Sequence, residues 1–353
     1  MSPSGPSGKV QTVLGPIEPG SLGVTLTHEH LLIDLTCYFQ MPDEASLRGC
    51  VERPLTMDML GKVWGIWQTV KDQQRLLDET VAVEELLRYR HAGGGSLVDV
   101  TSIGIARDPL ALTRISRATG LHIVMGASHY VPVSHPPDMD SRSEESITEQ
   151  IVQDVTVGVG DTGVRSGIIG EVGNFHPLSE NERKVLRASA HAQIETGAPI
   201  LIHPGLHPDS PLEIMRELVD AGAEPSRVII GHLDAIRPLS AITELAQSGC
   251  YLEYDRSGAE STDFDYTVSG VTMPMPTDAQ RIESLEHLIA EGFGDRLLVA
   301  HDVCTKADLT RYGGKGYAHF LDSIARRMQA RGHSRDQIES ILVHNPARAL
   351  TFA

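Results

Sequence analysis

Eight short apolar runs, separated by amphipathic segments, constrain the fold of this chain more than any other feature. The runs are mainly apolar rather than cleanly alternating, which is typical of parallel strands that are buried on both faces. The runs cover residues 24–32, 96–101, 122–127, 166–173, 199–205, 227–234, 250–255 and 296–302. Repeated alternation of strand and helix predicts a parallel sheet, and eight repeats predict its closure into a (β/α)8 barrel, an α/β fold.

The segments between the later runs have the periodicity and the end signals of helices. Ser179 or Asn181 is a suitable cap for the first of them. Each segment ends at a glycine just before the next apolar run, as helices before strands commonly do. We therefore expect helices over residues 181–197, 211–222, 238–249 and 277–292.

The connection between the first two runs, residues 36–92, is too long to be a structureless loop. Residues 57–77 and 80–93 both read as helices. The second is the expected barrel helix before the second strand. The first contains Trp64 and Trp67 and is expected to form a helical insertion at the mouth of the barrel, as one wall of a pocket.

Length and composition agree with one aliphatic core. The chain has 353 residues, of which 41% are hydrophobic and only 5% aromatic, which suits a barrel filled with Val, Ile and Leu. We expect a single domain over residues 1–353, with the insertion at about residues 36–79. The net charge of −17 argues against nucleic acid as a partner, because no basic stripe is present to meet phosphates.

The same sequence indicates the cell compartment. The N-terminus has no apolar stretch typical of a secretory signal, and no run is long enough to cross a membrane. The four cysteines have no CxxC spacing, so free thiols in a reducing compartment are expected. These features predict a cytoplasmic protein without a membrane partner. Cys304 is expected close to the functional site because it follows Asp302 by two residues.

Metal-binding side chains stand at the C-terminal ends of five runs, where barrels of this kind carry their active sites. His28 and His30 are two residues apart on the first run, so both can point into the barrel mouth while Glu29 points away. A single histidine at such a place is more often structural, but six suitable groups at five strand ends indicate a metal site. The six are His28, His30, Glu171, His203, His232 and Asp302.

The number of these groups predicts two metal ions. A catalytic zinc usually takes three protein ligands, so six exceed one such site. Two ions about 3.5–4 Å apart need a bridging group, and the carboxylate of Glu171 on a central strand suits that position. Nitrogen and oxygen ligands favour Zn²⁺, with manganese, cobalt or iron as alternatives.

The motifs around these residues resemble those of the phosphotriesterase family of the amidohydrolase superfamily. They are TLTHEH, GIIGEVG, ILIHPG, GHLD, VAHD and HNPARALTF. The resemblance implies a two-metal barrel in which His28, His30 and Asp302 hold one ion and His203 and His232 the other. In the true phosphotriesterases a carboxylated lysine bridges the ions. Here residues 72–183 contain no lysine, so Glu171 takes that place.

Within this family the closer likeness is to an animal branch, the phosphotriesterase-related proteins. It is carried by ERKVLRASAHAQ, GCYLEYD and HDVCTKADLTRYGGKGY. This likeness implies an amidase that cleaves N-acetyltaurine to taurine and acetate, with related N-acyl amino acids as weaker substrates. It also implies a homodimer.

The expected chemistry is hydrolysis by a hydroxide that bridges the two metal ions, since water between two cations loses its proton near neutral pH. Asp302 would take that proton and pass it to the leaving nitrogen, and Glu171 would hold the metal pair. A lactonase or a phosphotriesterase on the same metal centre remains the alternative. A non-catalytic binding protein is the second alternative, and it conflicts with the complete ligand set.

An anionic N-acyl substrate needs its own donors. Arg256, which follows Asp255 where phosphotriesterases place a histidine, is the first choice, because a guanidinium matches a sulfonate or carboxylate with two hydrogen bonds. Lys306 and Arg311 are second choices, although a solvated surface position is equally expected for both. Tyr130, at the end of the third run, could orient the substrate through its hydroxyl.

Three further polar residues lie close to these positions. His129 and His301 each neighbour a better-placed residue and should point the other way on their strands, so we exclude both from the ligand set. Asp234, two residues after His232, is expected to orient that histidine from behind.

Overall fold

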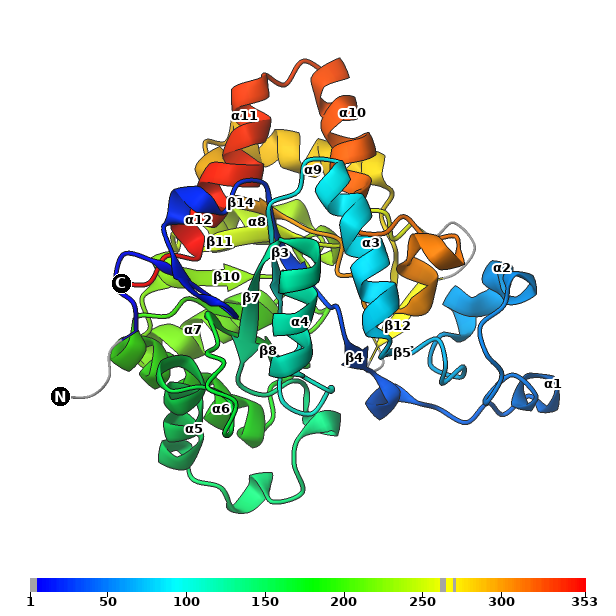
Figure 1. Ribbon diagram of the computed structural model, residues 1–353, viewed down its shortest axis with the longest axis horizontal. Helices are drawn as coiled ribbons and strands as arrows, with labels where there is room; N and C mark the ends of the chain where they lie inside the picture. Colours follow the sequence, from blue (N-terminus) through cyan, green and yellow to red (C-terminus); the bar gives the residue numbers. More distant parts are fainter. Residues whose placement is uncertain (1–4, 261–264, 269–270) are drawn as a thin grey trace.

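The central element is one sheet of eight parallel strands, whose order in space is the order of the chain (Figure 1). The computed structural model describes residues 5–260, 265–268 and 271–353, and for Trp64 and residues 265–268 and 271–274 the backbone alone. The strands are β3 (Thr25–Glu29), β6 (Ser96–Asp99), β7 (His122–Ala127), β8 (Ile168–Gly173), β9 (Ile200–His203), β10 (Val228–Ile230), β11 (Tyr251–Tyr254) and β14 (Leu297–Val299). Each lies inside one of the eight predicted runs.

The first and last strands of the sheet, β3 and β14, lie against each other. The Asp302 N–H donates to the His28 carbonyl oxygen at 3.2 Å, just beyond β14. The Thr27 hydroxyl also reaches the Val299 carbonyl oxygen, at 3.5 Å. These bonds bring the two edges together, and the predicted (β/α)8 barrel is confirmed.

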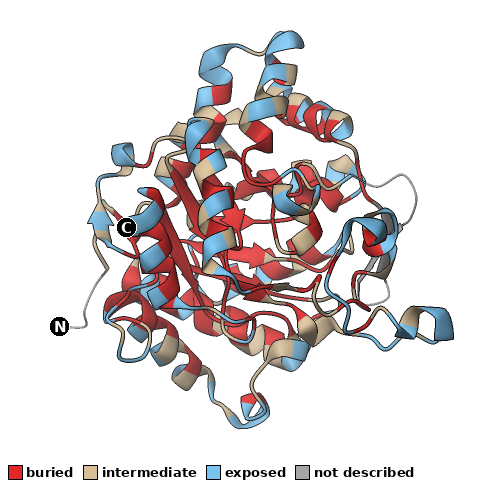
Figure 2. Cartoon of the chain, turned by 45° about the vertical axis from the view of Figure 1, so that its right-hand side comes forward, coloured by how far each residue is buried: buried red, intermediate tan, exposed pale blue. Residues whose placement is uncertain are grey.

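Aliphatic side chains fill the barrel, as the low aromatic content indicates. Alternate strand residues form one fully buried cluster, with Val98, Val124, Ile168, Leu201, Ile229 and Leu298 among its members. Val10 joins this cluster from a short hairpin of β1 (Val10–Thr12) and β2 (Gly15–Ile17), which covers one end of the barrel. Figure 2 shows the buried strands at the centre and exposed residues on the outer surfaces of the helices.

Helices surround the sheet and confirm the four predicted segments. Ser179 caps α6 (Glu180–Thr196) in a capping box with Glu182, and Gly197 ends it with a φ of +73°. The other helices of the ring are α3 (Glu79–His91), α4 (Pro109–Thr119), α5 (Glu144–Thr156), α7 (Ser210–Asp220), α8 (Leu239–Ala246) and α9 (Asp278–Ala290). Short helices α10 (Ala325–Ala330), α11 (Arg335–Glu339) and α12 (Asn345–Ala349) complete the chain.

The prediction of one helix over residues 57–77 is wrong. The segment holds three short helical turns, η3 (Met57–Met59), α2 (Leu60–Val63) and η4 (Trp64–Ile66). Gly61 and Gly65 within this segment weaken a continuous helix. The chain then pairs β5 (Arg75–Leu76) with β4 (Ile33–Asp34), which ties the insertion back to the barrel. The second predicted helix is confirmed as α3.

A second element that the sequence patterns did not predict lies between β11 and α9. There β12 (Asp265–Val268) and β13 (Val271–Pro274) form an antiparallel pair.

The four cysteines are free, as expected. Within the described residues, no helix has the length and apolar character needed to span a membrane.

Candidate metal centre

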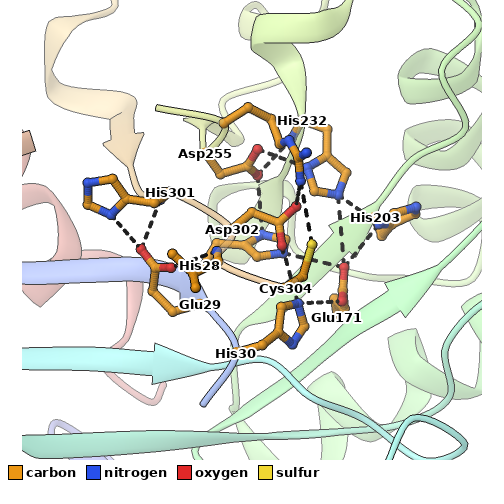
Figure 3. Close-up of polar contacts among 12 residues, drawn as sticks. His28, Glu29, His30, Glu171, His203, His232, Asp255, His301, Asp302 and Cys304 are labelled. Atoms are coloured by element: carbon orange, nitrogen blue, oxygen red, sulfur yellow. Dashed lines mark hydrogen bonds and ion pairs between the residues drawn. The ribbon is translucent and has the colours of Figure 1, made fainter. Parts of the chain in front are cut away.

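The six predicted ligands come together at the C-terminal ends of the strands (Figure 3). Three overlapping groups have ligand atoms within 4.8 Å of one another, and two of these groups consist of the predicted ligands alone. One group is His28, His30 and Asp302, and the other is Glu171, His203 and His232. All are buried except His203, which is partly exposed. The barrel thus gathers residues that are far apart in the sequence at one rim.

Glu171 lies between the two groups. Its Oε1 is 3.2 Å from His30 Nε2, and its Oε2 is 3.0 Å from His203 Nδ1. The same Oε2 is 3.4 Å from His28 Nε2. One carboxylate therefore faces nitrogen atoms of both groups, which is the geometry that a bridging ligand requires.

Three backbone positions at the metal centre have a positive φ. Gly170, before Glu171, has a φ of +136°, and a Cβ there would lie 2.2 Å from the Leu201 carbonyl oxygen. His232 and Asp302 adopt positive φ values of +56° and +49°. Non-glycine residues rarely adopt this region, and it costs about 1–2 kcal/mol per residue, so the surrounding packing must hold both side chains in place.

Polar groups behind the histidines fix their orientation. His30 Nδ1 is 2.8 Å from Thr101 Oγ1. His28 Nδ1 is 3.1 Å from Glu253 Oε2 and 3.2 Å from Asp255 Oδ2. Such partners determine which ring nitrogen faces a metal. The sequence patterns missed Glu253 and Asp255, although their spacing of two on one strand places them on one face, as it does for His28 and His30.

Asp234 does not have the role that was expected for it. His232 Nδ1 pairs with Asp255 Oδ1 at 2.8 Å. The Asp234 carboxylate accepts from Arg281 Nε at 2.6 Å and from the backbone N–H of Arg256 at 3.2 Å. The expectation that Asp234 orients His232 is therefore wrong, because the buried guanidinium of Arg281 takes that carboxylate.

The electrostatic environment of the centre is strongly acidic. Burial would lower the pKa of His30, but Asp302 and Glu171 outweigh it and raise the pKa to about 9. Burial would also lower the pKa of His28, and Asp255, Glu171 and Glu253 raise it well above its usual value. The arrangement thus stabilises positive charge at this place.

The residues present fit divalent cations. The Nδ1 atom of His28 faces Glu253 and Asp255, which leaves its buried Nε2 without a hydrogen-bond partner and directed at Glu171 and Asp302. A neutral imidazole coordinates a metal through such a lone pair. Buried nitrogen and carboxylate donors without thiolate ligands suit a divalent metal such as zinc.

A cavity opens over the centre. Its wall carries apolar and aromatic side chains from separate elements, including Leu35, Tyr38, Trp67, Tyr130, Leu206 and Met275. Trp67 therefore lines the pocket as the sequence predicts, whereas the side chain of Trp64 lies outside the described residues. Cys304 also lines it, in agreement with its expected place.

The predicted substrate residues separate into two sets. Arg256 and Tyr130 line the cavity. Lys306 does not reach it, because its ammonium pairs with Asp72 at 2.6 Å, at a different depression of the surface. Arg311 pairs with Glu84 at 3.0 Å on the exposed surface. The structure thus places Lys306 and Arg311 outside the lining of the cavity.

Arg256 forms a close ion pair with Asp302. The guanidinium Nη1 donates to Asp302 Oδ2, while Oδ1 of the same carboxylate lies 3.3 Å from His30 Nε2. Burial would raise the pKa of Asp302, but Arg256 and the neighbouring histidines lower it to about 2. Asp302 is therefore a carboxylate with one oxygen facing the metal site and the other held by a permanent cation.

The two excluded histidines point away, as predicted. His301 Nδ1 pairs with Glu29 Oε1 at 2.8 Å, and its Nε2 accepts from the Phe320 N–H at 2.9 Å. Figure 3 shows His301 and Glu29 at one side of the metal cluster. His129 is buried with its ring centroid 6.0 Å from that of His135, and it does not line the cavity.

Comparison with known proteins identifies the family. A model described as phosphotriesterase family matches residues 8–350. The chain belongs to the phosphotriesterase family. Relatives of this chain that are named N-acetyltaurine hydrolase include the following two. The protein from Tetraodon nigroviridis is 43% identical, and that from Homo sapiens is 42% identical, each over 98% of this chain and 99% of its own.

A solved structure agrees with this membership. The resiniferatoxin-binding protein from Rhodobacter sphaeroides superposes with a TM-score of 0.94 at 33% identity, covering 99% of this chain and 98% of that chain. The phosphotriesterase-family chain described here is a hydrolase, and its histidine and carboxylate groups provide a divalent-metal site.

Proposed function

We propose that this hydrolase cleaves the amide bond of N-acetyltaurine to release taurine and acetate, with related N-acyl amino acids as weaker substrates. The observation that carries the proposal is the 43% identity, over nearly the full length of both chains, to a relative named N-acetyltaurine hydrolase. The metal cluster and the cavity above it support the same reaction, because amide hydrolysis requires an activated water and a polarised carbonyl group.

Two divalent cations, most suitably Zn²⁺, complete the proposed centre. His28, His30 and Asp302 would hold one, His203 and His232 would hold the other, and Glu171 would contribute to both. When bound, the cations lower the pKa of water and polarise the substrate carbonyl oxygen. The separation of the ligand atoms into two groups that meet at Glu171 supports this assignment.

Asp302 is the proposed proton carrier. Its carboxylate takes the proton of the attacking water and then returns that proton to the departing amide nitrogen. Arg256 holds Oδ2, so the carboxylate cannot rotate freely. An amine is a poor leaving group, and protonation of its nitrogen is therefore the step that most needs a fixed carboxylic acid.

Arg256 is also the proposed partner of the sulfonate. Among the described residues that line the cavity, it supplies the guanidinium or ammonium group, and the other basic side chains there are imidazoles of the metal centre. A guanidinium has five N–H donors in a planar fork, so it can bind Asp302 through one edge and a sulfonate through another.

Parallel assays on metal-reconstituted protein test this function. N-acetyltaurine, an N-acetyl amino acid, an acyl-homoserine lactone and a paraoxon-like triester are compared at equal enzyme concentration. We expect the highest kcat/KM for N-acetyltaurine, with taurine and acetate released in equal amounts. A higher value for the lactone or the triester would contradict the proposal.

A further inference from the structure

The insertion delivers a tyrosine hydroxyl to the edge of the metal centre. Tyr38 lies in the turn η2 (Thr36–Tyr38), at the beginning of the insertion. Its hydroxyl is 3.3 Å from the hydroxyl of Tyr130, and the two rings meet edge to face with centroids 6.1 Å apart. Residues 92 positions apart in the sequence therefore share one hydrogen bond at the cavity wall.

Aromatic packing fixes the position of Tyr38. Its ring centroid is 5.6 Å from that of Trp67, which the same insertion contributes, and 6.4 Å from that of Phe175 beyond β8. Edge-to-face aromatic contacts of this kind stabilise a fold by more than the burial of their apolar area alone. The hydroxyl of Tyr38 is thus presented by a ring that is held on two sides.

Tyr130 is held equally well and lies closer to the metal ligands. Its ring is buried and packs edge-on against His203 at a centroid distance of 5.0 Å. Its carbonyl oxygen accepts from His135 Nε2 at 2.8 Å. Gly173 makes room for this arrangement, since a Cβ there would lie 2.8 Å from the Tyr130 ring.

Charge sets the direction of the hydrogen bond between the two hydroxyls. Tyr130 shares its cavity with the carboxylates of Glu171 and Asp302, which attract a hydroxyl proton. A phenol is protonated at neutral pH, so each hydroxyl has one proton to place. The favourable arrangement has Tyr38 donating to the Tyr130 oxygen, with the Tyr130 proton directed into the cavity. Accepting one hydrogen bond also strengthens Tyr130 as a donor.

We infer that Tyr38 is a positioning residue, which orients the Tyr130 hydroxyl so that Tyr130 donates its hydrogen bond to an oxygen of the substrate bound in the cavity. This inference rests on the proposed function for the identity of the substrate, an N-acyl compound whose carbonyl oxygen provides the acceptor. The insertion then contributes to turnover through one hydrogen bond, in addition to forming a wall.

A cycle of single and double substitutions tests the pair. Tyr38→Phe and Tyr130→Phe each keep the ring and remove the hydroxyl. We expect Tyr130→Phe to lower kcat by about 10²-fold, as loss of a preorganised donor does. Tyr38→Phe should lower kcat by about fivefold, the worth of one ordinary hydrogen bond, with little change in KM. The double variant should be no slower than Tyr130→Phe, because the inferred role of Tyr38 is exerted through the Tyr130 hydroxyl.

Tyr312→Phe is the matched control, because Tyr312 packs near Lys306 outside the cavity. Its kcat should equal that of the wild type, and all variants should keep the wild-type metal content and melting temperature. Multiplicative losses in the double variant, or a wild-type kcat for Tyr38→Phe, would overturn the inference.

The substrate for this cycle is the one that the wild-type protein cleaves fastest in the parallel assays. Preference for the lactone or the triester, with the expected coupling still present, would contradict the proposed function and leave the tyrosine pair supported. Rapid cleavage of N-acetyltaurine without coupling would contradict the tyrosine pair alone. Absence of activity on every substrate would overturn both.

Discussion

Asp255 binds His232 through both carboxylate oxygens, accepting from the ring Nδ1 at 2.8 Å and from the backbone N–H at 2.8 Å. The second of these oxygens also lies 3.2 Å from Nδ1 of His28. One buried carboxylate therefore orients a histidine from each of the two ligand groups. This relationship explains how the positive φ of His232 is maintained, because the backbone and the ring are held by the same side chain.

Removal of that carboxylate should weaken metal binding at both positions. We expect Asp255→Asn to lower metal affinity by about 10- to 100-fold, because an amide cannot accept at both of its ends. Competition with a chelator, followed by metal analysis, measures the effect. Asp161→Asn, at an exposed position, is the matched control. Wild-type affinity in Asp255→Asn would show that the histidines need no support from behind.

Asp302→Asn separates proton transfer from metal binding. The amide keeps an oxygen that can face the metal site but cannot take up a proton, so kcat should fall by about 10²–10⁴-fold. Metal content is measured on the same preparation. Retained metal together with wild-type turnover would exclude Asp302 as the proton carrier.

Arg256→Ala should change activity in two ways. Loss of the partner of Asp302 should lower kcat for every substrate, and breaking this buried pair should destabilise the fold by about 3 kcal/mol. Loss of the guanidinium should also raise KM for N-acetyltaurine more than for a neutral acetamide. Steady-state kinetics on both substrates gives the comparison.

Lys306→Ala serves as the control for Arg256, because the Lys306 ammonium pairs with Asp72 away from the cavity. We expect it to leave both KM values unchanged. An equal rise in KM for the charged and the neutral substrate in Arg256→Ala would count against a sulfonate contact.

His129 should make the fold sensitive to acid. Burial, with smaller effects from His135, Arg142 and Arg107, lowers the pKa of His129 to about 3. The unfolded chain binds a proton at this imidazole below about pH 6.5, whereas the folded chain does so only near pH 3. Stability should therefore fall as the pH decreases through this window, by at most about 1.4 kcal/mol per pH unit from this residue.

Urea unfolding at several pH values measures that dependence. His129→Gln should show a shallower fall in the free energy of unfolding between pH 6.5 and pH 4 than the wild-type chain. His91→Gln, at an exposed position in the last turn of α3, provides the matched substitution. An unchanged slope in His129→Gln would contradict the neutral, buried imidazole.

The sequence predicts the barrel and the ligand set because both depend on local patterns. A strand end, a ligand type and a spacing of two are visible at His28 and His30 without knowledge of the fold. The partners of those ligands are not local. Asp255 and Asp234 are both acids close to His232 in the barrel, and only the buried Arg281 decides which one remains for the histidine.

The structure of the insertion also depends on contacts that are not local in the sequence. Its apolar residues suggest a helix, but they pack as separate turns against the barrel rim, where two glycines permit the breaks. The pairing of Lys306 with Asp72 also depends on this packing, since the two residues are 234 positions apart. A side chain that a local pattern places in a site can therefore pair instead with a residue of a distant segment, as Lys306 does with Asp72.

Anomalous diffraction from crystals of the zinc-reconstituted protein tests the metal centre most directly. We predict two peaks per chain, one among His28, His30 and Asp302 and the other beside His203 and His232, with Glu171 contacting both. A single peak, or metal bound away from Glu171, would contradict the two-cation centre on which the proposed hydrolysis depends.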